Sequence, residues 1–343
     1  MSGAAEGDDN GKTAVCARTM TVFIIRRLLQ SLGVLLATSV IVFLGVFAIG
    51  NPADILIAAD ATQAERQAAI VALGLDRPLV EQYWIFLTNA LQGDLGRSFV
   101  FNQPAIGLIL ARLPATLELA FIALLIALIA GIPLGLIAGL KPQSLVDETI
   151  MTGSILGFSL PNFWQGMMLI MIFSVWLGWL PAGGRGDTTQ FLGVTTSLLN
   201  WDGIAHLILP ATNLALFNLA LVIRLTRTGV REIMPLDFIK FARAKGLTER
   251  RIVLVHVLKN IMIPVVTVVG MEFGSIIAFA VVTETIFSWP GIGKLLIDSI
   301  MLLDRPVVVS YLLVVVFMFI VINLLVDIAY SLLDPRIRLR DAQ

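Results

Sequence analysis

The residue types that most often carry catalysis are scarce in this chain of 343 residues. Its two histidines, His206 and His256, have no metal-binding side chain four residues further on, so a helical zinc-protease pattern is absent. The single cysteine, Cys16, excludes an intrachain disulfide and a cysteine metal site. The sequence therefore argues against a metalloenzyme.

Two short segments resemble fragments of catalytic motifs. The sequence GFSLP around Ser159 lacks the second glycine of a nucleophile turn, and no histidine lies in an obvious partner segment. The sequence PGIGK, which ends at Lys294, lacks the full spacing of a phosphate-binding loop. We expect no catalytic residue, metal or cofactor in this chain, and no hydrolysis of ATP by the chain alone.

One carboxyl group lies deep within an apolar stretch, at Glu272. An unpaired charge within a bilayer costs several kcal/mol, so a side chain of this kind is neutral, paired or hydrated. Two interpretations remain open. Glu272 is either a protonated core residue or part of a hydrated substrate path, where it meets a cationic group of the substrate.

A second set of polar residues recurs at spacings of four, three and four in the last apolar stretch, which places it on one side of a helix. The set comprises Asn323, Asp327, Tyr330 and Asp334. A structural role, with Asp327 or Asp334 paired to a basic residue of an inner loop, is the favoured interpretation. A role in gating is the alternative.

The elements that hold these residues are apolar and long. Hydrophobic residues make up 57% of the chain and charged residues 14%, and the mean hydropathy is +0.91. Six runs reach the roughly 20 residues that a helix needs to cross a bilayer. They cover residues 28–49, 115–139, 150–179, 205–229, 261–286 and 307–332. The sequence predicts an all-α membrane protein with six transmembrane helices, the third kinked or split at Pro161.

The distribution of basic residues predicts the orientation. If the N-terminus is inside, 17 of the 24 Lys and Arg residues lie in inner segments and 7 in outer ones. Because basic residues concentrate on the cytoplasmic side, both termini are predicted to be cytoplasmic. We expect residues 1–19 to be a disordered tail, and the first run to be a retained span rather than a signal peptide.

The outer segment of residues 50–113 is longer than a simple connection requires. Its helical periodicity predicts one or two amphipathic helices on the outer face. They either provide a docking surface for an extracytoplasmic protein or cover the bundle.

Small residues recur every fourth position in three of the runs, which allows helices to approach closely in lipid. The stripes are Gly131, Gly135 and Gly139; Gly153 and Gly157; and Gly270, Gly274 and Ala278. Packing within the bundle and packing against another subunit are both compatible with this pattern.

The most informative segment runs from Arg224 to Pro264 between two apolar runs. It contains nine basic and three acidic residues, which is typical of a cytoplasmic loop. Its apolar and basic positions alternate at helical spacing, which predicts a helix, a turn at Gly246 and a second helix. Such a surface suits a protein partner; enforcing topology or binding anionic lipid is the alternative.

This segment resembles the cytoplasmic signature loop of permease subunits of binding-protein-dependent ABC importers, in the dipeptide and oligopeptide permease branch and of the first permease subunit type. Gly246 and Ala242 match that signature, whereas Lys240, Phe241, His256 and Lys259 depart from its general form. Further resemblance to the branch lies in FIIRRLLQSLGVLL, LGLDRPLVEQY, GDLGRS, LPATLELA, TETIFSWPGIGKLLIDSI and NLLVDIAYSLLDPRIR. It covers about residues 20–340.

The resemblance implies a type I ABC importer permease fold. The implied domains are a first helix with a long periplasmic loop (20–112), an ABC transmembrane type-1 domain (113–332) with a cytoplasmic coupling loop (230–260), and a cytoplasmic tail (333–343). It also implies a coupling helix that rests on an ATPase subunit. The ATPase-coupling residues are Phe241, Ala242, Arg243, Ala244, Lys245, Gly246 and Leu247.

The partners implied are a second homologous permease subunit, two cytoplasmic ATPase subunits that hold ATP and Mg, a periplasmic or lipid-anchored solute-binding protein, and membrane lipid, with no nucleic acid. The implied function is ATP-driven import of dipeptides and oligopeptides across the bacterial inner membrane. Nickel chelates, glutathione and sugar- or opine-like solutes are alternative substrates for the same architecture. A stand-alone secondary carrier or channel is a more distant alternative.

Overall fold

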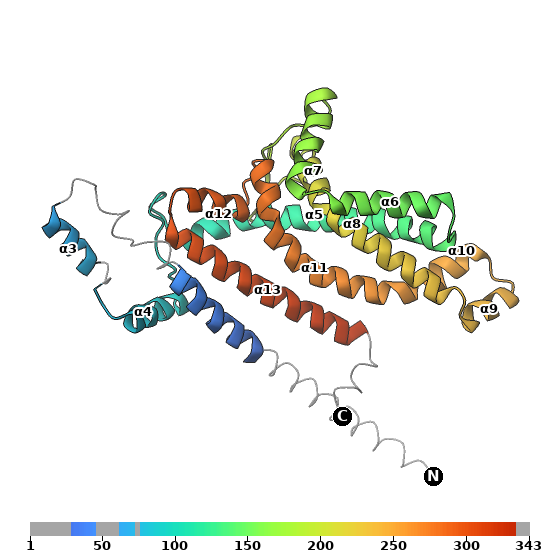
Figure 1. Cartoon of the computed structure of the whole chain (residues 1–343), viewed down its shortest axis with the longest axis horizontal. Helices are drawn as coiled ribbons and strands as arrows, with labels where there is room; N and C mark the ends of the chain where they lie inside the picture. The colour runs from blue at the N-terminus through green and yellow to red at the C-terminus, as the bar shows by residue number, and fades with distance from the viewer. Residues whose placement is uncertain (1–28, 46–61, 73–75, 334–343) are drawn as a thin grey trace, which may run out of the picture. The chain divides into compact units, whose positions relative to one another are not determined.

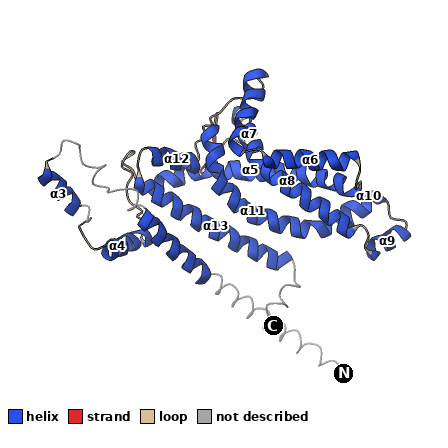
Figure 2. Cartoon of the chain, viewed as in Figure 1, coloured by secondary structure: helices blue, strands red, loops and turns tan. Residues whose placement is uncertain are grey.

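The computed structural model describes residues 29–45, 62–72 and 76–333 of the chain. Almost all regular structure in this part is helical (Figure 2). Several predictions fall outside the described residues: those for the tail 1–19 with Cys16, for residues 334–343 with Asp334, and for the side chains of Asp327 and Tyr330.

The chain divides into two compact units. The first combines residues 1–92 with residues 312–343. It contains the apolar helix Leu29–Gly45, α3 (Gln63–Ala72) and α4 (Leu79–Leu91). In this unit, Phe43 of the apolar helix meets the ring of Tyr83 of α4 edge-on, with 5.4 Å between the ring centroids. Helices α3 and α4 confirm that the long loop contains helices, and their packing on the outer face stays a prediction.

The second unit covers residues 93–311 and holds most of the helices. In Figure 1, α5, α8 and α11 lie side by side along its length. The elements in order are α5 (Ala105–Leu140), α6 (Leu145–Ser159), α7 (Asn162–Leu169), the π-helix η1 (Ile170–Trp176), β1 (Thr189–Phe191), β2 (Val194–Thr196), α8 (Trp201–Ile233), α9 (Asp237–Ala244), α10 (Glu249–Arg251), the π-helix η2 (Ile252–Val257), α11 (Leu258–Ile286), α12 (Ile292–Met301) and the beginning of α13 (Arg305–Leu333).

Helices α5 and α8 pack closely because glycines remove the side chains between them. A Cβ atom at Gly135 would lie 2.6 Å from the Cβ of Thr226, and one at Gly139 would lie 2.6 Å from that of Val230. The predicted stripe of small residues in α5 is therefore a packing surface within the bundle. Gly153 of α6 differs, because a Cβ atom there would meet nothing within 4 Å.

The third apolar run is split at Pro161, as predicted. Helix α6 ends at Ser159, α7 begins at Asn162, and the axes on either side of the break differ by 106°. Gln165 caps the broken end, since its Nε2 donates to the carbonyl oxygens of Gly157 at 2.5 Å and Leu160 at 2.8 Å. Backbone groups freed by a break within a membrane need such partners.

By length and composition, four helices in the described part of the chain could each cross a membrane: Ala105–Leu140, Trp201–Ile233, Glu249–Ile286 and Arg305–Val326. The bent pair Leu145–Ser159 and Asn162–Trp176 makes five if it counts as one span. The described helix Leu29–Gly45 is apolar but shorter. The architecture is thus a helical membrane bundle, and the sixth span remains a prediction.

Candidate functional site

The predicted helix, turn and helix after the fourth apolar run are all present. Helix α9 has eight residues, and Asp237 in its first turn suits the positive end of the helix dipole. It ends at Ala244, and the turn that follows contains Gly246, whose φ of +76° is left-handed and favours glycine. The Gly246 amide donates to the carbonyl oxygen of Arg243 at 2.9 Å, which closes the helix end. The next helix begins at Glu249.

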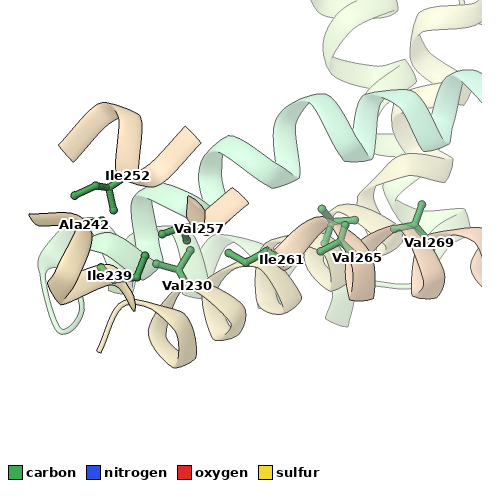
Figure 3. Close-up of a cluster of buried hydrophobic side chains, with 9 residues drawn as sticks. Val230, Ile239, Ala242, Ile252, Val257, Ile261, Val265 and Val269 are labelled. Carbon is green, nitrogen blue, oxygen red and sulfur yellow. The ribbon is translucent and has the colours of Figure 1, made fainter. Parts of the chain in front are cut away.

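One side of α9 is anchored in the chain's own core (Figure 3). Ile239 and Ala242 are buried, three residues apart, so they share one side of the helix. They pack in a cluster that also contains Val230 at the end of α8, Ile252 and Val257 of η2, and Ile261, Val265 and Val269 of α11. Helix α9 is therefore packed against two long helices of the bundle, α8 and α11.

A second side of α9, about 100° around the helix from the buried side, is exposed and aromatic. Phe238 is 43% exposed and Phe241 is 60% exposed, and the Lys245 ammonium lies 4.5 Å from the centre of the Phe241 ring. Arg243 donates to the Glu249 carboxylate at 2.7 Å, and this hydrogen bond raises the pKa of Arg243. Among the apolar residues of this segment, Phe238 and the predicted coupling residue Phe241 are exposed. Ala242 and Leu247 instead pack on the chain's own core.

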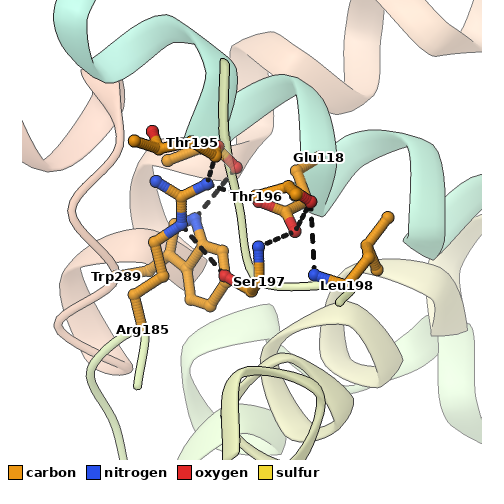
Figure 4. Close-up of polar contacts among 8 residues, drawn as sticks. Glu118, Arg185, Thr195, Thr196, Ser197, Leu198 and Trp289 are labelled. Carbon is orange, nitrogen blue, oxygen red and sulfur yellow. Dashed lines mark hydrogen bonds and ion pairs between the residues drawn. The ribbon is translucent and has the colours of Figure 1, made fainter. Parts of the chain in front are cut away.

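A buried polar network that sequence reasoning missed lies beside the β1–β2 hairpin, which precedes α8 in the chain (Figure 4). Arg185 donates to the Glu118 carboxylate of α5 at 2.5 Å, and both side chains are largely buried. Glu118 also accepts hydrogen bonds from the Ser197 amide at 2.7 Å and the Thr196 hydroxyl at 3.1 Å. The β1–β2 hairpin is thereby joined to α5, and the Arg185 guanidinium lies 5.7 Å from the centre of the Trp289 ring.

A second missed residue, Glu284, is fully buried at the end of α11. Its carboxylate accepts a hydrogen bond from the Thr116 hydroxyl of α5 at 2.5 Å and one from the Lys294 amide at 2.9 Å. Gly291 and Gly293 leave room for it, since a Cβ atom at either would collide with this carboxylate. Trp289 donates to the Ala115 carbonyl oxygen at 3.0 Å. Glu284 therefore holds α5, α11 and the start of α12 together.

The remaining predicted site residues lie neither at α9 nor in the networks of Glu118 and Glu284. Glu272 lies in the middle of α11, is partly buried, and makes no hydrogen bond or ion pair to any residue that the structure describes. Asn323 is partly buried in α13. In the described ranges, no group of three or more His, Cys, Asp or Glu residues is placed to hold a metal. The role of Glu272 stays a prediction.

The described bundle combines long apolar helices, a broken span and a helix–glycine–helix segment between α8 and α11. The chain is similar to a chain of the MetNI methionine ABC transporter in inward-facing crystal structures. The two superpose with TM-scores of 0.52 and 0.54, covering 67% of this chain and 98% of that chain at 15% and 16% identity. At such identity the likeness establishes the fold alone.

The chain belongs to the family described as the binding-protein-dependent transport system inner membrane component, which it matches over residues 131–339. Residues 20–120 match the family's N-terminal component. The chain is 43% identical to the di/tripeptide transport system permease protein DppB of Pseudomonas aeruginosa and 40% identical to the dipeptide transport system permease protein DppB of Escherichia coli K12. It is 39% identical to the oligopeptide transport system permease protein AppB of Bacillus subtilis.

Each of these three alignments covers 93% of this chain and 99% of the relative. The chain is thus a permease subunit located in the inner membrane, within a transport system that uses a separate binding protein.

Proposed function

We propose that the chain forms one half of the translocation pathway of an ATP-driven importer for dipeptides and oligopeptides. A second, related permease subunit supplies the other half. Two ATPase subunits on the cytoplasmic side hold ATP and Mg, and this chain contributes no ATPase site. Peptides are favoured as substrates because the relatives named above are peptide permeases and align with the chain over nearly its full length.

The observation that supports coupling best is the two-sided character of α9. Ile239 and Ala242 anchor it to α8 and α11, while Phe238 and Phe241 remain exposed. Exposed aromatic residues flanked by basic residues are typical of protein docking surfaces. A force applied by a partner to the aromatic side would therefore reach the bundle through the buried side.

The proposed orientation places α9 in the cytoplasm and the β1–β2 hairpin outside. The two lie at opposite ends of α8, whose 33 residues span about 50 Å, more than a bilayer core of about 30 Å. The arrangement has six spans and cytoplasmic termini. Closure of the ATPases would then shift α9 and switch the bundle between outward and inward access, a rigid-body alternation.

Gly246 offers a direct test of coupling. A Cβ atom at this position would meet nothing within 4 Å in the chain itself, so a larger residue would not collide with the fold. We expect Gly246→Leu to reduce the ATPase activity stimulated by peptide-loaded binding protein by roughly tenfold, the loss typical of a disturbed contact at an interface. The measurement uses the complete importer reconstituted in liposomes.

Gly246→Asn is the matched control, because asparagine tolerates a positive φ better than leucine does. The comparison of the two variants distinguishes strain in the backbone at position 246 from the bulk of the new side chain at the interface. Gly246→Asn should retain more stimulated ATPase activity than Gly246→Leu. Unchanged stimulated activity in Gly246→Leu, with all subunits assembled, would refute the coupling role of this turn.

A further inference from the structure

A cluster of neutral polar side chains surrounds the break between α6 and α7. It consists of Asn162 at the start of α7, Asn213 of α8 and Thr283 of α11, and is called the polar cluster below. The Asn213 amide donates to the Asn162 oxygen at 2.6 Å and to the Thr283 hydroxyl at 3.0 Å. The Asn162 amide donates to the Thr283 hydroxyl at 3.3 Å. Three separate helices thus bring their polar groups to one place.

The polar cluster has unused hydrogen-bonding capacity. Asn213 is 2% exposed, yet its Oδ1 atom has no hydrogen-bond partner among the described residues. Buried carbonyl oxygens of this kind normally have a partner, and leaving one unsatisfied costs free energy. Asn162 is only partly buried, so the edge of the polar cluster formed by this residue is exposed, whereas Asn213 and Thr283 lie behind it. A ligand with an N–H group would complete the hydrogen bonding of Asn213.

The surroundings favour a neutral ligand group over an ion. No charged side chain makes a hydrogen bond to the three residues. Gly166 allows α7 to approach its neighbours, since a Cβ atom there would lie 3.5 Å from the Asn213 amide nitrogen and 3.2 Å from the Phe287 ring. Gln165 satisfies the carbonyl groups freed by the helix break, which leaves Asn162 available.

We propose that the polar cluster is a binding site for the backbone amide of a peptide in transit, with Asn213 Oδ1 accepting the peptide N–H. The inference rests on the proposed function and adds a substrate contact to it. A carboxamide side chain has the same donor and acceptor groups as a peptide bond, so it can replace the water that a peptide loses in the membrane. Because every peptide has this backbone group, the contact is independent of the peptide's side chains.

The test compares transport of two nearly identical compounds by the complete importer in liposomes: alanyl-alanine and alanyl-lactate, in which an ester oxygen replaces the peptide N–H. The binding protein is the same in every measurement, so its own preference cancels when variants are compared. The wild-type importer should transport the peptide in preference to the ester. In Asn213→Ala this preference should fall roughly threefold to tenfold, the factor expected for one lost hydrogen bond.

Asn218→Ala is the matched control, because Asn218 is also a buried asparagine of α8 whose Oδ1 has no partner among the described residues, but it makes no hydrogen bond to the polar cluster. The control should keep the wild-type preference. If Asn213→Ala does not assemble, Asn162→Ala carries the test, since Asn162 is partly exposed and should change the preference in the same direction.

An equal loss of transport for both compounds in Asn213→Ala would overturn the proposal. It would indicate that the polar cluster, with or without bound water, only supports the helix break. An unchanged preference would also overturn the proposal, while peptide transport by the wild type would leave the proposed function intact. Failure of the assembled wild type to transport either compound would instead contradict the peptide function itself.

Discussion

The two elements that adjoin α8, the hairpin before it and α9 after it, are held in different ways. Helix α8 itself is tied to α6 near α9 by the Arg227–Asp147 ion pair. At the α9 end, Ile239 and Ala242 make apolar contacts, and the Arg243–Glu249 ion pair is exposed to solvent.

At the hairpin end, the Glu118–Arg185 ion pair is buried. Arg185 donates to the Thr195 carbonyl oxygen of β2, and Glu118 accepts from the Ser197 amide just after β2. Apolar contacts are non-directional, whereas buried hydrogen bonds fix geometry.

Directional hydrogen bonds suit an element that stays fixed, whereas apolar contacts suit an element that moves against its neighbours. The hairpin end is specified by directional bonds between α5, the hairpin and the loop around Trp289. Among the described residues, no buried side-chain hydrogen bond joins α9 to α8 or η2, and their contact is the apolar cluster. We infer that the transport cycle moves the α9 end most and the hairpin end least.

The largest effect is expected from breaking the buried ion pair. Arg185→Met removes the cation and leaves the Glu118 carboxylate buried, which costs about 3–5 kcal/mol because the charge is left without its partner. A denaturation curve of the purified importer in detergent measures the loss. The double variant Glu118→Gln/Arg185→Met should recover part of it, since no unpaired charge remains. Equal stability of Arg185→Met and wild type would mean that the pair does not hold the hairpin end.

A smaller effect on stability is expected at the α9 end, from Ile239→Ala. The substitution leaves a cavity beneath α9 and costs about 2–4 kcal/mol. It should also weaken stimulated ATP hydrolysis, because α9 loses its connection to η2 and α11. Arg243→Gln is the control on the same helix and should leave the melting temperature unchanged, since its ion pair is exposed. If the Ile239→Ala importer is destabilised but keeps full stimulated ATP hydrolysis, the apolar cluster beneath α9 has no role in coupling.

Features that depend on neighbouring residues could be predicted from the sequence. The break at Pro161 follows from the geometry of proline, and the turn at Gly246 from the tolerance of glycine for a positive φ. The close approach of α5 and α8 follows from the spacing of Gly131, Gly135 and Gly139, although the sequence did not identify α8 as the partner.

Features that depend on distant pairs could not be predicted. Glu118 and Arg185 are 67 residues apart and Thr116 and Glu284 are 168 apart, so only the folded bundle brings them together. From the sequence, Glu272 was a candidate because it lies in the middle of a long apolar run, whereas Glu284, near the end of that run, was not identified. A signal was present, because Glu118 and Glu284 both lie in apolar segments that resemble the family, LPATLELA and TETIFSWPGIGKLLIDSI.

The central claim is that the exposed side of α9 meets an ATPase in the cytoplasm while the hairpin lies outside. Labelling with a membrane-impermeant maleimide tests it, in a Cys16→Ser background that carries either Phe241→Cys or Leu192→Cys. Leu192 is 89% exposed at the hairpin and serves as the outer reference.

In intact spheroplasts, only the Leu192→Cys protein should react. After permeabilisation, the Phe241→Cys protein should react when the ATPase subunits are absent and be protected when they are bound. Labelling of Phe241→Cys in intact spheroplasts, or equal labelling with and without the ATPases, would contradict the account.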